Sequence, residues 1–427
     1  VEKPVETILS GPAASAIGGL FFSGYSNALM VDVGGTTTDM AFIQEGQVTV
    51  SDTGARVGEI ETAVKAARIR TACVGCDSRI SFGQGGRVQV GPDRVVPLSR
   101  LAAKYPHVRE SVLSLNLREK NFWKPSDIEF WMLHKQVDPQ ELGITDAKHI
   151  QLLNLLNQGP ASLTEILNQL GLHHSVQLKA ADLFRQGLIE PATLTPTDLL
   201  HISGQMDAWD AEVARQAVTC ACGINDRNPK TFVDQTLDQI VAMMVEEAVV
   251  FLAGQQEDTR LPDAVDGQWG RWLLDESIRG SHGHLAVNIS SRFPVIGIGA
   301  PAGIFVKRVA ETLKAPFVLP EHAHVANAAG AVAGSVVAEK EAILYTRETS
   351  GSHAYVVQIG DERTSFTEYE EAVAHARKKV GKMATRSAES AGANEPQVKI
   401  RVNTEGDLER IRARAVGNPR LSEQFGE

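Results

Sequence analysis

Residues 28–98 carry short apolar runs that alternate with polar positions and are broken by glycine and proline, a pattern that predicts a strand-rich region. Before them, residues 7–24 place small side chains at helical spacing, which predicts a helix able to pack closely on a sheet. Apolar residues flank the sequence DVGGTTTDM at 32–40 on both sides. This stretch therefore predicts a strand, a glycine-rich turn and a second strand, whereas a P-loop would continue into a helix.

The middle of the chain changes character, because residues 125–192 are rich in Leu and Gln at helical spacing. Residues 162–198 have the pattern of a winged helix, with Ser162 as the N-cap of a capping box. Residues 207–252 predict amphipathic core helices. Residues 254–283 are polar and glycine-rich, so they predict a loop.

The last third predicts one further strand–turn–helix unit and a small appendage. Residues 287–313 fit a strand, a glycine turn and a helix, and residues 326–334 place alanine and glycine at helical spacing suited to tight packing. After residue 340 we expect two short strands, a helix over 366–391, a final strand over 397–402 and a frayed polar tail. Together these elements predict a small βαβ appendage.

The stretch 32–40 has the composition of a phosphate-binding turn. The adjacent Gly34 and Gly35 let the backbone approach an anion closely and direct N–H groups at it. Hydroxyl groups for phosphate oxygens come from Thr36, Thr37 and Thr38. Asp32, at the end of the first strand, suits a magnesium ion bound through water. For the motif taken alone, an ordinary hairpin with a Gly-Gly turn is the alternative.

Length and charge agree with a soluble, enzyme-sized chain. At 427 residues it predicts two to three domains. It carries 42 basic and 52 acidic residues, a net charge of −10, which disfavours nonspecific binding to nucleic acid or to an anionic membrane. The sequence shows neither an apolar run long enough for a membrane span nor a signal-peptide pattern, so we expect a cytoplasmic protein.

Four cysteines fall in two close pairs, so a zinc site has to be weighed. The pairs are Cys73 with Cys76, and Cys220 with Cys222. The C-x-x-C spacing is common in structural zinc sites, whereas C-x-C is less common and the two pairs lie far apart in the sequence. We therefore expect buried, reduced thiols and keep a metal site as the alternative.

Several blocks of the chain resemble the hydantoinase/oxoprolinase family. The blocks occur in family order, and they are PVETILSGPAASAIGG at 4–19, CVGCDSRI at 73–80, VGPDRVVPL at 90–98, TLTPTDLLHISG at 193–204 with DAWDAE at 207–212, and PVIGIGAPAG at 294–303 with PEHAHVANAAGAVAG at 320–334. The resemblance is weakest over residues 101–190 and the C-terminal tail. Cys76 departs from the family pattern, which has glycine at this position.

This resemblance implies an α/β fold: an actin-like (ribonuclease H-like) ATPase lobe with an inserted, mostly helical, winged-helix-like module. The expected domains are a first part of the ATPase lobe with the phosphate hairpin (1–100), the inserted module (101–200), the remainder of the lobe with the adenosine turn and a second connecting helix (201–340), and a small C-terminal α/β appendage (341–427). Family members begin with another phosphate hairpin, which this sequence lacks. We therefore expect a fragment without the first lobe, with two alternatives: the lobe resides on another polypeptide, or the chain is a degenerate homologue.

The family resemblance further implies an ATP-dependent amidohydrolase that opens a small cyclic amide or imide of the hydantoin or 5-oxoproline type, with ATP and Mg²⁺ as cofactors. The implied catalytic residues are Asp32, which would hold the magnesium ion, and Asp39, which would orient the turn or a water molecule. The implied nucleotide-binding residues are Gly34, Gly35, Thr36, Thr37 and Thr38 at the phosphates, Gly297, Gly299 and Ala300 at the adenosine turn, and Asn327 at the hinge.

Two other functions stay open. One is the carboxylase branch of the same family, in which ATP activates bicarbonate or a ketone. The other is a non-catalytic nucleotide-binding scaffold, which the missing first hairpin and the winged-helix-like insert would suit. Residues 150–190 have a net charge of −1, so DNA binding by that insert is not expected. The expected partners are a small cyclic substrate and a second family subunit in a homo- or hetero-oligomer, without nucleic acid or membrane.

Overall fold

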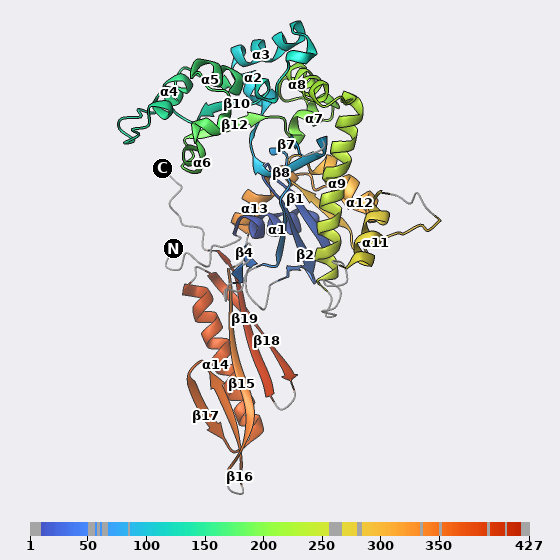
Figure 1. Cartoon of the computed structure of the whole chain (residues 1–427). Helices are drawn as coiled ribbons and strands as arrows, with labels where there is room; N and C mark the ends of the chain where they lie inside the picture. Colours follow the sequence, from blue (N-terminus) through green and yellow to red (C-terminus); the bar gives the residue numbers. More distant parts are fainter. Residues whose placement is uncertain are drawn as a thin grey trace. The chain divides into compact units, whose positions relative to one another are not determined.

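The computed structural model describes residues 10–49, 56–57, 60–61, 67–83, 86–255, 267–279, 284–333, 336–349, 352–390, 393–405 and 408–419. The chain divides into two units, Val1–His324 and Val325–Glu427, which are considered separately (Figure 1). Both units combine helices with sheets, which confirms the mixed α/β class. Among the described residues, no helix is both long and apolar enough to cross a membrane.

A six-stranded sheet of mixed direction forms the centre of the first unit. Its strands are β1 (Ala28–Val33), β2 (Thr38–Gln44), β3 (Gln47–Val48), β6 (Ile69–Ala72), β13 (Val295–Ile298) and β14 (Phe317–Val318). They lie in the order β14-β13-β1-β2-β3, with β6 also paired to β2. β1 and β2 form an antiparallel hairpin, whereas β13 runs parallel to both β1 and β14. The predicted hairpin at 32–40 is therefore confirmed.

Helices cover both faces of this sheet. α1 (Ser10–Ser23) lies on one face, where Gly19 leaves room for the Met30 side chain, since a Cβ at Gly19 would lie only 2.7 Å from Met30. On the other face, Leu29 and Val31 join the core formed with α9 (Pro229–Ala253) and α12 (Ala302–Thr312). Because side chains alternate along a strand, Asp32 projects to the same side as Met30, toward α1.

A second group of strands and helices continues from the central sheet. β7 (Ser78–Phe82) pairs with β8 (Val88–Arg94), and a four-stranded sheet has the order β11-β10-β12-β9. Its strands are β9 (Val96–Pro97), β10 (Phe130–Leu133), β11 (Ala161–Ser162) and β12 (Ile189–Thr193), and a short pair is formed by β4 (Arg56–Val57) and β5 (Ile60–Glu61). The α-helices are α2 (Leu98–Lys104), α3 (Pro106–Leu113), α4 (Ala147–Leu156), α5 (Leu163–Gln169), α6 (Ala181–Arg185), α7 (Pro196–Ile202) and α8 (Ala211–Ile224). Between them lie 3-10 turns at Ser114–Leu117, Lys120–Phe122, Pro125–Asp127 and Ser175–Leu178. Another 3-10 turn, Ala323–Val325, comes later in the chain, after β14. The Ser162 hydroxyl accepts the Glu165 N–H and caps α5, as predicted.

The loop prediction for residues 254–283 is wrong in part. Residues 268–279 form α11 (Gln268–Arg279), which packs on α9. The helix is amphipathic, with Trp272 and Ile278 among its apolar positions, but it is short, contains a glycine and follows a polar, glycine-rich stretch, so that its stability depends on the α9 surface. Residues 256–266 and 280–283 lie outside the described part.

The second unit is larger and more regular than the predicted βαβ appendage. It contains α13 (Ala326–Ala333), β15 (Val336–Thr349), β16 (Ser352–Ile359), β17 (Glu362–Phe366), α14 (Tyr369–Ser390), β18 (Ala393–Glu405) and β19 (Leu408–Pro419). The five strands form one antiparallel sheet in the order β17-β16-β15-β19-β18, and α14 packs on it through an alanine-rich face. The predicted polar tail is in part strand β19, whose alternating Ile411, Ala413 and Ala415 are fully buried. Residues 420–427 lie outside the described part.

Candidate functional site

The turn between β1 and β2 presents a row of backbone amides. The Gly34 N–H donates to the Thr37 carbonyl oxygen at 2.9 Å and closes the turn. In contrast, within the described part of the chain the N–H groups of Gly35, Thr36 and Thr37 donate to no protein acceptor. Successive amides of this kind form a concave site for an anion. Thr36 is also exposed, so its hydroxyl can reach the same ligand.

The segment that follows β6 supports this turn from below. The Cys76 N–H donates to the Gly34 carbonyl at 3.0 Å, and the Asp77 N–H donates to the Gly35 carbonyl at 2.6 Å. The contact is so close that a Cβ on Gly75 would lie 2.5 Å from the Gly35 carbonyl oxygen. Because both turn carbonyls are occupied from this side, the turn is held with its amides facing the other way.

An ion pair lies next to the turn. The Asp77 carboxylate is 3.2 Å from the Arg94 guanidinium, and a Cβ on Gly35 would lie 2.6 Å from the same Asp77 oxygen. A side chain at position 35 would therefore displace the Asp77 carboxylate from its place beside the turn. The sequence analysis did not identify Asp77 and Arg94 as site residues. Both lie in blocks that resemble the family, Asp77 within CDS at 76–78 and Arg94 within PDR at 92–94, and these blocks were the available signal.

Two carboxylates stand directly opposite each other beside the turn. Asp32 on β1 pairs with Asp39 on β2, and both are half-buried. Burial raises the pKa of Asp32, a hydrogen bond from buried Ser15 on α1 opposes the shift, and the charge of Asp39 adds to it. Burial likewise raises the pKa of Asp39, against hydrogen bonds from the hydroxyls of Thr71 at 2.6 Å and Thr37 at 3.3 Å. Like charges placed opposite each other repel, and a cation between them would relieve that repulsion.

The glycine turn after β13 reaches the same place. Asp32 pairs with Ile298 at the ends of the two parallel strands. The next residue, Gly299, has a φ of 91°, and a Cβ there would collide with the Val33 carbonyl and lie 3.1 Å from Asp32 Oδ1. Only glycine allows this approach. The structure thus brings Gly299 to the Asp32 carboxylate, with exposed Ala300 between it and the start of α12.

Three of the predicted site residues are placed differently. Thr38 is fully buried, and its hydroxyl donates to the Val74 carbonyl at 2.7 Å, so it fixes the segment beneath the turn and does not face a phosphate. Gly297 is buried on the other face of the sheet, where a Cβ would press on α12 at 3.1 Å from the Ala302 Cβ. It therefore makes room for the helix and not for a nucleotide ring. Asn327 belongs to the second unit, on α13.

The sequence TPTD at 195–198 anchors the supporting segment. The Thr197 N–H and hydroxyl both donate to the Cys76 carbonyl, at 3.0 and 2.8 Å. Next to it, the fully buried Asp198 carboxylate accepts the Ser99 N–H at 2.8 Å and the Thr195 N–H and hydroxyl, each at 2.8 Å. These bonds connect α2 and α7 to the segment that holds the turn. Asp198 and Thr197 are thus positioning residues.

The cysteines are reduced, and their environment disfavours thiolates. Burial raises the pKa of Cys76 to about 12, of Cys220 to about 12 and of Cys222 to about 11, whereas Cys73 is exposed. Within the described residues, no group of three or more His, Cys, Asp or Glu side chains is arranged to hold a metal ion. Protonated thiols are poor metal ligands.

Comparison with known proteins identifies one family. Residues 1–104 match the hydantoinase/oxoprolinase family, which confirms the resemblance over the part of the chain that contains the turn. A search of curated protein sequences finds no match. Similar solved structures include a nucleotide-free acetone carboxylase (12% identity, TM-score 0.45) and an ATP-dependent caprolactamase from Pseudomonas jessenii (12% identity, TM-score 0.44). Each match covers 96% of this chain and 50% of the other, so the chain spans about half the length of these structures.

Proposed function

We propose that this chain forms the phosphate-binding part of an ATP-dependent enzyme of the hydantoinase/oxoprolinase type that opens a small cyclic amide or imide, such as a hydantoin or 5-oxoproline. The observation that carries the proposal is the placement of the opposed carboxylates Asp32 and Asp39 beside a turn with three unpaired amides. The family match covers the same residues.

The residues present fit a magnesium–nucleotide pair. Carboxylate oxygens are the ligands Mg²⁺ prefers, and Asp32 and Asp39 offer them from opposed positions on two strands. The amides of Gly35, Thr36 and Thr37 would hold phosphate oxygens. When bound, ATP would supply the phosphoryl group that activates a weakly electrophilic amide oxygen, and Mg²⁺ would neutralise the associated charge.

The chain's own groups position these ligands. Ser15 fixes the orientation of the Asp32 carboxylate, and Thr71 does the same for Asp39. Gly299 closes the site on the β13 side without a side chain. Arg94, held by Asp77 next to the turn and half-exposed, is placed to add positive charge for phosphate oxygens.

For the architecture, we propose an actin-like lobe. The central sheet supports this assignment, because it combines a hairpin with two parallel strands. Helix α1 covers one face of the sheet, and α9 and α12 cover the other. We further propose that the helices and four-stranded sheet within residues 101–200 are a winged-helix-like packing module. Ala300 is proposed to contribute to the nucleotide site, and the protein is proposed to act in the cytoplasm as an oligomer.

Nucleotide binding is the first test. Isothermal titration calorimetry should show ADP or ATP binding to the chain that depends on Mg²⁺ and that Asp32→Asn weakens by about tenfold or more, since a charge-assisted contact is lost. Asp207→Asn, at an exposed carboxylate outside the site, is the matched control. Nucleotide binding that is indifferent to both Mg²⁺ and Asp32→Asn would refute the site.

Turnover is the second test, measured for the chain together with any polypeptide that supplies the other phosphate hairpin. The proposal expects ATP hydrolysis that hydantoin or 5-oxoproline stimulates. Stimulation by bicarbonate with a ketone would instead indicate the carboxylase branch. Nucleotide binding without any stimulated turnover would indicate the non-catalytic scaffold.

A further inference from the structure

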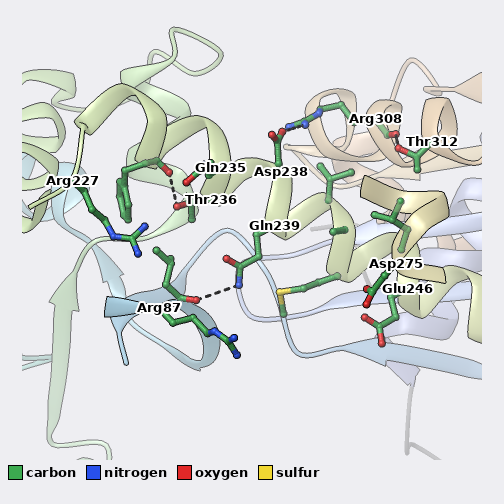
Figure 2. Close-up of a pocket in the computed structure, with 16 residues that line it drawn as sticks. Arg87, Arg227, Gln235, Thr236, Asp238, Gln239, Glu246, Asp275, Arg308 and Thr312 are labelled. Atoms are coloured by element: carbon green, nitrogen blue, oxygen red, sulfur yellow. Dashed lines mark hydrogen bonds and ion pairs between the residues drawn. The ribbon is translucent and has the colours of Figure 1, made fainter. Parts of the chain in front are cut away.

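A large pocket of about 890 Å³ lies in the first unit between α9, α11, α12 and the start of β8 (Figure 2). Its volume is in the usual range for small-molecule sites. It is separate from the candidate phosphate site, because α9 and α12 cover the face of the sheet opposite to the one on which Asp32 lies. None of the residues assigned above to nucleotide binding lines it.

Two arginines line this pocket near the start of β8. Arg227 donates from Nη2 to the Gly86 carbonyl at 2.6 Å, and its guanidinium lies 5.9 Å from the centre of the Phe82 ring. The residue after Gly86 is Arg87, which is exposed. The backbone bond of Arg227 therefore lies next to the residue that carries the Arg87 side chain, which extends from there toward the middle of the pocket (Figure 2).

These two cations lack carboxylate partners in the described part of the chain, whereas nearby acids are already paired. Asp238 forms an ion pair with Arg308, and Glu246 forms one with Arg271. Glu246 lies at the far end of the pocket from Arg227, beside Asp275 (Figure 2). Positive charge is therefore concentrated at the Arg87 and Arg227 end, where the two like charges would be stabilised by an anion.

One face of α9 forms the wall between the two ends. The lining positions on α9 recur at helical spacing from Phe232 to Glu246, a length of about 21 Å at 1.5 Å per residue. Apolar groups, among them Val241 and Met243 on this helix and Ile278 on α11, lie beyond the arginines. Polar side chains, among them Gln235 and Gln239, also line the wall. A ligand with an anionic head and a short apolar chain would match the arginines and the apolar groups together.

We propose that this pocket binds a small organic anion, a carboxylate or a phosphate monoester with an apolar chain, through Arg87 and Arg227. The anionic group is held at the arginine end, and the apolar chain lies along α9 toward Met243. The site goes beyond the proposed nucleotide function and does not depend on it.

Calorimetry on the whole chain with hexanoate, hexyl phosphate and 1-hexanol tests the proposal. We expect at least one of the two anions to bind about tenfold more tightly than the neutral alcohol, and the comparison of the two identifies the preferred head group. Equal binding of 1-hexanol, or binding of neither anion at millimolar concentration, would overturn the proposal.

Variants locate the site. Arg87→Ala should lower the anion affinity about tenfold, because an exposed side chain is removed without loss of a structural bond. Arg227→Lys keeps the charge but not the Gly86 geometry and should give a smaller loss. Arg215→Ala, at an exposed arginine on α8 outside the pocket, and Asp32→Asn should leave the affinity unchanged. Anion affinity that survives Arg87→Ala combined with Arg227→Lys would contradict the assignment.

Discussion

Replacing Asp32 by asparagine should stabilise the first unit while it weakens magnesium–nucleotide binding. Asp32 and Asp39 stand opposite each other, both half-buried, and their mutual charge raises the pKa of Asp32 after the larger effect of burial. Asparagine removes one charge and still offers an oxygen to Ser15. Two like charges that face each other to hold a cation lower the stability of the folded protein when the cation is absent.

The size of the gain follows from the strand geometry. Directly opposed residues have Cβ atoms about 5 Å apart. Two unit charges at that distance repel by about 3 kcal/mol at an effective dielectric constant of about 20, and by about 1 kcal/mol in bulk water. Because both carboxylates are partly solvated, we expect Asp32→Asn to raise the free energy of unfolding by about 1–2 kcal/mol at neutral pH.

The gain should depend on pH in a defined direction. A raised pKa means that the folded chain binds a proton at Asp32 more tightly than the unfolded chain does. The contribution of Asp32 to the free energy of unfolding therefore falls as the pH rises from the ordinary aspartate pKa of 3.8 through the raised pKa. The advantage of asparagine should be largest above that window and should shrink as the pH falls toward its lower end.

Urea unfolding followed by tryptophan fluorescence measures this effect, because all five tryptophans lie in the first unit. Asp207→Asn, at an exposed carboxylate, is the control and should change stability by less than about 0.5 kcal/mol. Adding Mg²⁺ with ADP should stabilise the unsubstituted chain more than Asp32→Asn. A loss of stability in Asp32→Asn at neutral pH, or equal stabilisation of both proteins by Mg²⁺ with ADP, would refute the reasoning.

Three further outcomes are expected. Gly35→Ala should weaken nucleotide binding about tenfold in calorimetry, because its Cβ would displace the Asp77 carboxylate. The control Gly381→Ala, inside α14, should bind nucleotide normally and raise the free energy of unfolding by about 0.5–1 kcal/mol. Thr197→Val should lower the unfolding free energy by about 1–2 kcal/mol in urea denaturation, because a buried hydroxyl bond to a carbonyl is lost. In a thiol titration of the native protein only Cys73 should react rapidly, and denaturant should expose the other three thiols; rapid reaction of a second thiol would contradict their burial.

Several local features of the first unit could be predicted from the sequence because they depend on neighbouring residues. The β1–β2 hairpin, the strand–glycine–helix unit at 287–313 and the Ser162 cap each rest on periodicity and turn chemistry within a short window. The position of Asp32 at a strand end beside the turn followed from the same pattern. In β19 isoleucine and alanine alternate with arginine, but alanines are too small and too weakly apolar to predict a strand next to so many charges, so the sequence predicts a polar tail there.

Only the tertiary structure decided which side chains meet at the turn. Thr38 could not be known to point inward, because the segment it binds comes from β6 and not from its own hairpin. Ser15, Asp77 and Arg94 come from α1, from the turn before β7 and from β8, and their approach depends on how these segments pack around the central sheet. Gly297 faces α12 for the same reason. The sequence determined the turn and its chemical groups through local periodicity, whereas long-range strand pairing and helix packing decided which groups face a ligand and which support it from behind.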